Sequence, residues 1–277
     1  MPSFLPTLPS LSSLVRKPTH SASPAEIPRY PSVELFAWQP RTGARNFGDH
    51  LSHVISATVA RERGFSFDDE TSRPRRLLAV GSILHFAQDG DTIWGSGVNG
   101  KIALDEIHAR KLDVRAVRGP KTAEVLRGLG IDVPEVFGDP ALLVPHFFKT
   151  RFRVTQEHDY IFIPNLNDLK THGRLANLVS PLNGWNRCVE AICSAKLVIA
   201  SSLHGIVLAE AFGVPARYVR LTETESQFKY DDYAQGTGRR ALVPARSIAE
   251  AREMGGHEPI RFDPEPLLEA FPFDLWD

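Results

Sequence analysis

One stretch of the chain restricts the fold more than any other, because in it a strand pattern runs directly into a buried-helix pattern. The apolar run at 197–200 is typical of a buried strand, and it ends in the polar turn Ser201-Ser202-Leu203-His204-Gly205. The segment from about Leu203 to Phe212 is apolar nearly all round, which predicts a helix buried between a sheet and its neighbours. Gly213 and Pro215 end it. This order is typical of α/β folds.

The same order of strand, turn and helix recurs along the chain. Strands are predicted at 33–38, 77–80, 114–117 and 160–164, and helices from Asn46-Phe47-Gly48-Asp49 through Ala60, from Pro120 to Leu129, and at 185–195. Alternation of this kind favours parallel sheets, right-handed crossovers and ligands at the carboxyl ends of the strands. We therefore predict an α/β protein with two Rossmann-like lobes.

Two composition changes predict where these lobes begin. Residues 1–30 are rich in Pro and Ser with little apolar periodicity, which predicts a flexible, disordered tail. The basic, weakly periodic stretch at 146–156 is typical of a connection between lobes. We expect an N-terminal lobe at 31–150 and a C-terminal lobe at 151–277.

The overall composition excludes several classes of protein. A net charge of -1 with 42% hydrophobic residues is ordinary for a globular chain and argues against a nucleic-acid partner held by bulk charge. No run approaches the roughly 20 apolar residues of a transmembrane helix, and no secretory signal is evident. We expect a cytoplasmic protein. Cys188 and Cys193 suit neither a metal pair nor a disulfide framework, so we expect packed thiols and no metal site.

The turn at 201–205 is a candidate anion site. Helix N-termini expose unpaired N–H groups and a positive dipole end, and here serine hydroxyls and His204 add further donors. The alternative is that Ser201 or Ser202 only caps the helix and that His204 is structural.

Other turns have the same character. Arg118 precedes the Gly119-Pro120 helix start and predicts a second anion site, or else a surface arginine beside a cap. Asn46 and Asp49 place an amide and a carboxylate after a strand, although Asn46 is also a natural N-cap. The glycine-rich loop at 95–100 lacks the spacing of a dinucleotide fingerprint or a P-loop. Trp94 stands where G-x-S-x-G needs glycine, which disfavours a serine hydrolase.

These turns occur together in one order, and that order resembles the polysaccharide pyruvyl transferase family over about residues 36–233. The motifs are Asn46-Phe47-Gly48-Asp49, Gly81-Ser82, Trp94-Gly95-Ser96-Gly97, Val117-Arg118-Gly119-Pro120, Gly138-Asp139-Pro140 and Ser202-Leu203-His204-Gly205. The resemblance implies a fold like that of the two-lobed GT-B glycosyltransferases and a role in exopolysaccharide or cell-surface glycan biosynthesis. It implies phosphoenolpyruvate as the donor substrate, no cofactor, and a saccharide acceptor that is often lipid-linked, which adds peripheral association with the inner membrane as an option.

The chemistry of this donor suggests roles for the candidate residues. Ketal formation protonates the enol methylene, adds a sugar hydroxyl to C2 and expels phosphate. We expect His204 as general acid or phosphate ligand, Arg118 on the donor's anionic groups, and Asp49 or Asp139 as the base; Asp139 is equally well a turn residue before Pro140. The other candidates for substrate binding are Asn46, Gly48, Gly81, Ser82, Trp94, Gly95, Ser96, Ser201, Ser202, Leu203, Gly205 and Lys229.

The segment 229–233 is predicted to follow a polar loop that closes over the ligand, with its tyrosines stacking on a sugar and Lys229 reaching an anion. The alternative is a solvated charged loop. Two other functions stay open at this point: a glycosyltransferase that uses a nucleotide sugar, and a protein that binds anions or glycans without turnover.

Overall fold

The computed structural model describes residues 30–40, 43–223 and 225–277, so the predicted tail lies outside the described residues except for Tyr30. The strands are β1 (Val33–Phe36), β2 (Arg75–Leu78), β3 (Thr92–Trp94), β4 (Asp113–Ala116), β5 (Ile161–Ile163), β6 (Val198–Ala200) and β7 (Ala216–Tyr218). The α-helices are α1 (Phe47–Glu62), α2 (Pro120–Gly128), α3 (Val144–Phe148), α4 (Leu166–His172), α5 (Trp185–Cys193), α6 (Leu203–Ala211), α7 (Phe228–Gly236), α8 (Ile248–Met254) and α9 (Glu265–Glu269). Short 3-10 helices are η1 (Leu84–Phe86), η2 (Leu104–Glu106), η3 (Pro140–Leu143) and η4 (Phe273–Trp276).

The strands form two parallel sheets, as predicted. One has the order β1-β2-β3-β4 and the other β5-β6-β7. Strand order follows chain order in both, so the described strands contain no reversal of the kind that marks the ligand crevice in dinucleotide-binding folds. A ligand site therefore depends on the turns beyond the strands' carboxyl ends.

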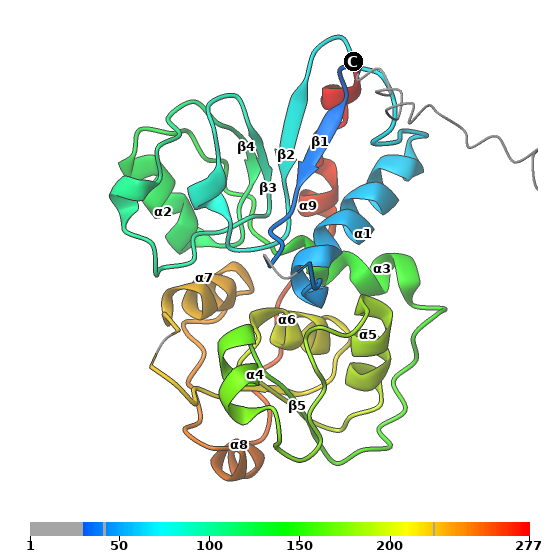
Figure 1. Cartoon of the computed structure of the whole chain (residues 1–277), viewed down its shortest axis with the longest axis vertical. Helices are drawn as coiled ribbons and strands as arrows, with labels where there is room; N and C mark the ends of the chain where they lie inside the picture. The colour runs from blue at the N-terminus through cyan, green and yellow to red at the C-terminus, as the bar shows by residue number, and fades with distance from the viewer. Residues whose placement is uncertain (1–29, 41–42, 224) are drawn as a thin grey trace, which may run out of the picture. The chain divides into compact units, whose positions relative to one another are not determined.

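Alternate residues of the first sheet face different helices. Leu77 packs into the core that contains α1, while its neighbour Leu78 packs into the core that contains α2. Figure 1 shows α1 and α2 on opposite sides of this sheet. The first sheet is thus covered on both faces, which explains why consecutive residues at the carboxyl ends of its central strands are fully buried, namely Leu77 and Leu78 in β2 and Ile93 and Trp94 in β3.

The core around α1 continues into the second half of the chain. Leu51 of α1, Val189 of α5 and Ile206 of α6 belong to one cluster of buried side chains. The prediction that α6 is buried all round is confirmed, since residues 205–209 are all buried. Residues 31–277 form one compact unit, and a lobe boundary near residue 150 stays a prediction.

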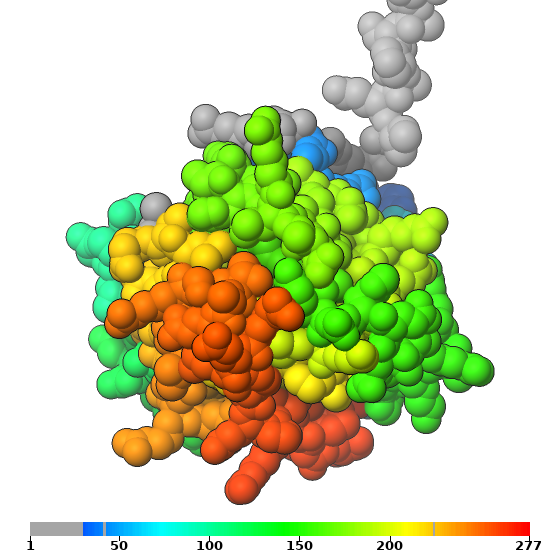
Figure 2. Space-filling view, turned by 90° about the horizontal axis from the view of Figure 1, so that it is seen from below, coloured from blue at the N-terminus to red at the C-terminus, as the bar shows by residue number. Residues whose placement is uncertain are grey.

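The opposite face of the second sheet is covered by α8. Phe162, Ile199 and Val219 form a small core there with Ala251 of α8. Figure 2 views this side of the molecule and shows α8 and its flanking segments, in orange, at the surface.

The segment from α9 onward returns to the first sheet, as the red ribbon in Figure 1 shows. The indole N–H of Trp94 donates to the Leu267 carbonyl at 2.8 Å, and Phe271 packs edge-on against the same ring. The indole of Trp276 donates to the Ser66 carbonyl at 2.6 Å and stacks on Phe65. Residues 267–276 therefore complete the core around the first sheet and α1.

Some sequence predictions need correction. β1 ends at Phe36 and β2 spans 75–78, so Ala79 and Val80 follow the strand as buried turn residues rather than continuing it. The predicted helices at 120–129 and 185–195 are confirmed to within two residues. Cys188 and Cys193 are buried free thiols, as expected, and burial raises the pKa of Cys193 to about 11. Among the described helices, none is long and apolar enough to cross a bilayer.

Candidate active site

A cavity of about 360 Å³ is lined by residues that follow the carboxyl ends of strands in both sheets. The loops after β1, β2, β3, β5, β6 and β7 all contribute, which agrees with the predicted location of a ligand. The lining residues are Trp38, Asn46, Asp49, Ser82, Ile83, His85, Phe86, Asn99, Lys101, Asn165, Leu166, Asn167, Ser202, Leu203, His204, Glu225 and Lys229.

Two longer helices begin at this cavity. Asn46 caps α1 and accepts a hydrogen bond from the Gly48 N–H at 2.9 Å. Ser202 caps α6, and its hydroxyl accepts from the Gly205 N–H at 3.4 Å. Both serve as the N-caps that the sequence allowed, and both also line the cavity. Their positive helix ends favour an anion there, in a chain whose net charge is only -1.

His204 lies in the first turn of α6, and its side chain packs against the start of α1. A β-carbon at Gly48 would come within 2.2 Å of His204 Nδ1, so only glycine leaves room for the ring. The imidazole Nε2 is buried, has no hydrogen-bond partner, and lies 3.6 Å from Asp139 Oδ2. Buried polar atoms usually have a hydrogen-bond partner, and the group that faces this nitrogen is the Asp139 carboxylate.

Asp139 stands behind His204 and is not among the cavity-lining residues. Its side chain is 1% exposed, and its Oδ1 accepts from the Ala141 N–H at 2.9 Å to cap η3. Asp139 therefore does stabilise the turn before Pro140, as the sequence allowed. The other oxygen of its carboxylate, Oδ2, faces His204.

Asp49 is the acidic candidate that does line the cavity. Burial raises its pKa to about 6, and the charge of Asp139 adds to this effect, while His204 and Lys229 act in the opposite direction. A carboxyl group with such a pKa exchanges protons near neutral pH, as a general acid or base requires.

Arg118 lies behind the cavity wall in a buried network. Its Nε donates to Asp232 at 2.9 Å, and its terminal nitrogens donate to Ser82 Oγ at 2.5 Å and to the Val98 carbonyl at 2.7 Å. Thr122 also donates to Asp232, so the ion pair joins α7 to the start of α2. Arg118 is 1% exposed and meets the cavity only through Ser82, so direct contact with a donor stays a prediction.

The remaining predicted binding residues divide into two sets. Ser82, Ser202, Leu203 and Lys229 line the cavity, together with Asn46. The others support its walls: Gly48 makes room for His204, Gly95 lies against Pro140, Ser96 bonds the Gly81 carbonyl, Ser201 accepts from the Asn165 N–H, Gly205 packs on Ala200, and Trp94 is fully buried.

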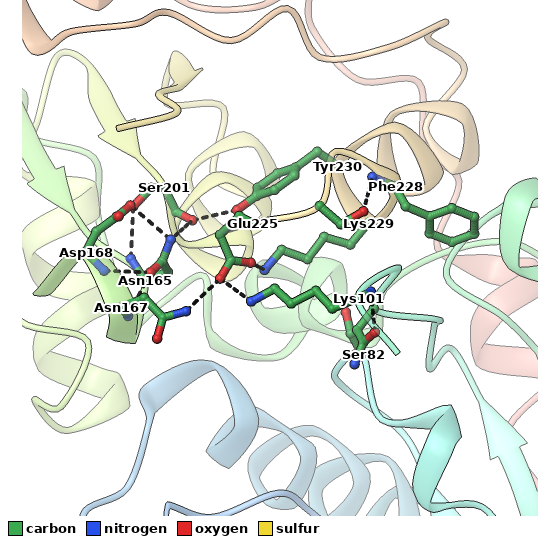
Figure 3. Close-up of polar contacts among 12 residues, drawn as sticks. Ser82, Lys101, Asn165, Asn167, Asp168, Ser201, Glu225, Phe228, Lys229 and Tyr230 are labelled. Atoms are coloured by element: carbon green, nitrogen blue, oxygen red, sulfur yellow. Dashed lines mark hydrogen bonds and ion pairs between the residues drawn. The ribbon is translucent and has the colours of Figure 1, made fainter. Parts of the chain in front are cut away.

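The prediction that tyrosines at 229–233 stack on a sugar is wrong. These residues belong to α7, and Tyr230 and Tyr233 are fully buried. Tyr230 stacks on Tyr218, and its hydroxyl donates to the Ser201 carbonyl at 2.7 Å. Figure 3 shows Tyr230 pointing toward Ser201. Tyr233 donates to Glu210. Their hydroxyls have internal partners, so the alternation of aromatic and charged residues reflects a helix with one buried face.

Sequence reasoning missed much of the polar lining. Asn165 caps α4 and follows β5, and with Asp168 it forms an Asn-x-x-Asp helix start that was a readable signal. Lys101 follows the glycine-rich loop, and Glu225 precedes α7; nothing in their local sequence singles them out. Among the described residues, no cluster of three or more His, Cys, Asp or Glu side chains is arranged to hold a metal ion.

The parallel α/β fold thus has, at the carboxyl ends of its strands, a cavity lined by an imidazole, a carboxyl group and two helix N-termini. The sequence matches the polysaccharide pyruvyl transferase family over residues 46–221, more than half of the chain. The chain belongs to this family and is a pyruvyl transferase.

Two individual relatives and one solved structure are also similar to this chain. The succinoglycan biosynthesis protein ExoV of Rhizobium meliloti is 29% identical over 236 residues, which cover 80% of this chain and 72% of ExoV. An uncharacterised protein of Acanthamoeba polyphaga mimivirus is 28% identical over 172 residues, covering 56% of this chain and 57% of that protein. A solved structure from Klebsiella pneumoniae, of a protein without a characterised function, has 13% identity and a TM-score of 0.48, covering 78% of this chain and 93% of that one.

Proposed function

We propose that the enzyme transfers the pyruvyl group of phosphoenolpyruvate to two hydroxyls of a saccharide, forming a ketal and releasing phosphate. The observation that carries this proposal is that one cavity brings together Asp49, His204 and the N-termini of α1 and α6. The donor has a carboxylate and a phosphate, and helix N-termini bind such groups without a metal or cofactor.

The reaction needs a proton at C3 of the donor and a base for the attacking hydroxyl. His204 donates the proton to the methylene carbon as the first hydroxyl oxygen adds to C2, and Asp49 accepts that hydroxyl's proton. Asp49 passes that proton to the departing phosphate, whose loss leaves an oxocarbenium carbon. The second hydroxyl oxygen then adds to this carbon and its proton goes to His204, which closes the ketal and restores both side chains. Asp49 is preferred over Asp139 as the base because only Asp49 lines the cavity.

Asp139 acts through His204. Its free carboxylate oxygen is 3.6 Å from Nε2, close enough to stabilise a protonated ring and to fix its orientation. This arrangement is analogous to the buried carboxylate that orients a catalytic imidazole in other enzymes.

The acceptor enters beside a more apolar wall of the same cavity. Trp38 and Phe86 line it, and Phe86 is 37% exposed, which offers flat surfaces to the apolar face of a sugar. The name of the relative ExoV refers to succinoglycan biosynthesis, which supports a polysaccharide acceptor here. A lipid-linked acceptor, a cytoplasmic location with peripheral association at the inner membrane, and a GT-B-like arrangement of the two sheets remain parts of this proposal.

Ligand-dependent thermal unfolding tests the donor. Phosphoenolpyruvate at millimolar concentration should raise the Tm of the wild-type protein, and His204→Ala should reduce the rise, whereas the exposed His108→Ala should not. Phosphate release in the presence of glycan acceptors then reports turnover. Stabilisation by a UDP-sugar with no response to phosphoenolpyruvate would instead favour glycosyl transfer, and donor binding with no phosphate release from any glycan would favour a binding protein.

A further inference from the structure

Glu225 collects donors from three separate segments at one point of the cavity wall, as Figure 3 shows. Its Oε1 accepts from the Lys101 ammonium and from Asn167 Nδ2 at 3.1 Å, and its Oε2 accepts from Lys229 Nζ at 2.5 Å. The Glu225 side chain is only 6% exposed. Lys101 follows β3, Asn167 lies in α4, and Lys229 lies in α7, so a single carboxylate ties together loops of both sheets.

The two lysines that meet there both line the cavity and retain donors. Lys101 has a side chain that is 35% exposed, and Lys229 one that is 15% exposed. An ammonium group has three N–H donors, and each lysine uses one of them on Glu225. The remaining donors are available to a ligand that enters the same cavity.

The electrostatics make these lysines dependent on Glu225. Burial lowers the pKa of Lys229, and the charges of Lys101 and Arg118 lower it further, whereas Glu225 raises it. Burial alone would raise the pKa of Glu225, but Lys229 and Lys101 outweigh that effect and hold it below its usual range. Two ammonium groups at one place are thus compatible with burial because a carboxylate lies between them.

We propose that Glu225 is a positioning residue that holds Lys101 and Lys229 as a two-lysine seat for a doubly charged phosphate group. The proposal rests on the proposed function, in which this group is the donor's phosphate and then the leaving phosphate. Two convergent ammonium groups bind a phosphate dianion better than they bind a carboxylate, because both ammonium groups can donate charge-assisted hydrogen bonds to the phosphate at once. The seat therefore distinguishes the donor from pyruvate, which carries a carboxylate alone.

The test compares Glu225→Gln, which keeps the shape and removes the charge, with Glu225→Asp, which keeps the charge. Glu223→Gln is the matched control, because Glu223 lies in the same loop with an 88% exposed side chain that pairs with Arg220. Calorimetric Kd values for phosphoenolpyruvate and for inorganic phosphate are measured from pH 6 to pH 9 on the full chain. The groups that act on Lys229 in this range are Glu225, Lys101, Arg118 and Asp49.

We expect Glu225→Gln to weaken both ligands by about tenfold at pH 8 and by less at pH 6, because loss of the carboxylate removes the charge that raises the pKa of Lys229. Glu225→Asp should restore most of the wild-type pH dependence, and Glu223→Gln should match wild type. If folded Glu225→Gln binds both ligands as tightly as wild type, or more tightly, at every pH, the two-lysine seat is wrong. It is also wrong if the wild-type protein binds neither ligand. Wild type that binds inorganic phosphate in a Glu225-dependent way but not phosphoenolpyruvate would support the seat and contradict the proposed donor.

Discussion

The imidazole of His204 lies so close to the backbone of Gly48 that a β-carbon at position 48 would stand 2.2 Å from Nδ1. The imidazole ring of His204, in the first turn of α6, therefore packs directly on the first turn of α1. Two helices from different halves of the chain fix one side chain, and the position of that side chain is sensitive to a single methyl group.

Gly48→Ala should reduce activity without unfolding the protein. Alanine suits a helix better than glycine, but the new methyl group displaces the His204 ring, and a misplacement of about 1 Å costs roughly a hundredfold in rate. Gly128→Ala is the matched control, because Gly128 lies in α2 with open space around it. Phosphate release and Tm, measured side by side, separate the two effects. Equal activities for the two variants would mean that the ring position is unimportant.

His204→Asn should remove the proton donor and lower kcat by on the order of 10² to 10⁴. Asp139→Asn should have a smaller effect in the same direction, since its amide oxygen can still accept from the Ala141 N–H while the charge facing His204 is lost. The measurement is the rate of phosphate release at saturating donor, with the exposed His108→Asn as control. A larger loss for Asp139→Asn than for His204→Asn would contradict the assigned roles.

Asp49→Asn should stabilise the protein at neutral pH. The pKa of Asp49 is raised to about 6 in the folded state from a usual 3.8, so the folded protein resists its ionisation. The resulting destabilisation is absent below about pH 4, grows between the two pKa values and is complete above about pH 6, where it amounts to at most about 3 kcal/mol.

The check is urea unfolding of ligand-free protein at pH 4 and pH 7.5, because a bound phosphate ester would itself titrate near pH 6. The gain in unfolding free energy should be seen at pH 7.5 and vanish at pH 4, and the exposed Asp105→Asn should show neither change. An equal gain in unfolding free energy at both pH values would mean that the raised pKa of Asp49 is not its cause.

Asp232→Asn should destabilise the fold, because it leaves the buried Arg118 guanidinium without its charge partner. Breaking a buried pair of this kind costs about 3 to 5 kcal/mol. Arg187→Gln breaks the exposed pair with Glu190 and should cost less than about 1 kcal/mol. Denaturant midpoints at constant m-value give the comparison. If Asp232→Asn unfolds at the wild-type midpoint, the network does not hold α7 to α2.

The sequence was sufficient to predict the parts of this molecule that follow from local pattern. The strand at 198–200, the buried helix α6 and its serine cap can be read from one stretch, because apolar periodicity and N-cap chemistry act over a few residues. His204, Asp49 and Ser202 line one cavity, because turns after parallel strands converge at the same edge, and their roles in binding a ligand there stay predictions.

The remaining features depend on contacts between distant residues. Arg118 looks like an exposed residue beside a helix cap, and its burial is set by Asp232, more than a hundred positions later. The link between Lys101 and Glu225 likewise spans 124 residues. No propensity or spacing reports such a pairing, because the two segments meet only when the fold is complete.

The contacts between α9, η4 and the first sheet impose an order on folding during synthesis. Domains generally fold as they emerge from the ribosome. Here the hydrogen bond from the Trp94 indole needs the Leu267 carbonyl, and the stacking of Phe65 needs Trp276, so neither contact can form until those residues have been made. A nascent chain that carries all four strands of the first sheet still exposes the apolar surface that residues 265–276 cover. The core of the first sheet is therefore complete only once residues 265–276 have been made and packed against it.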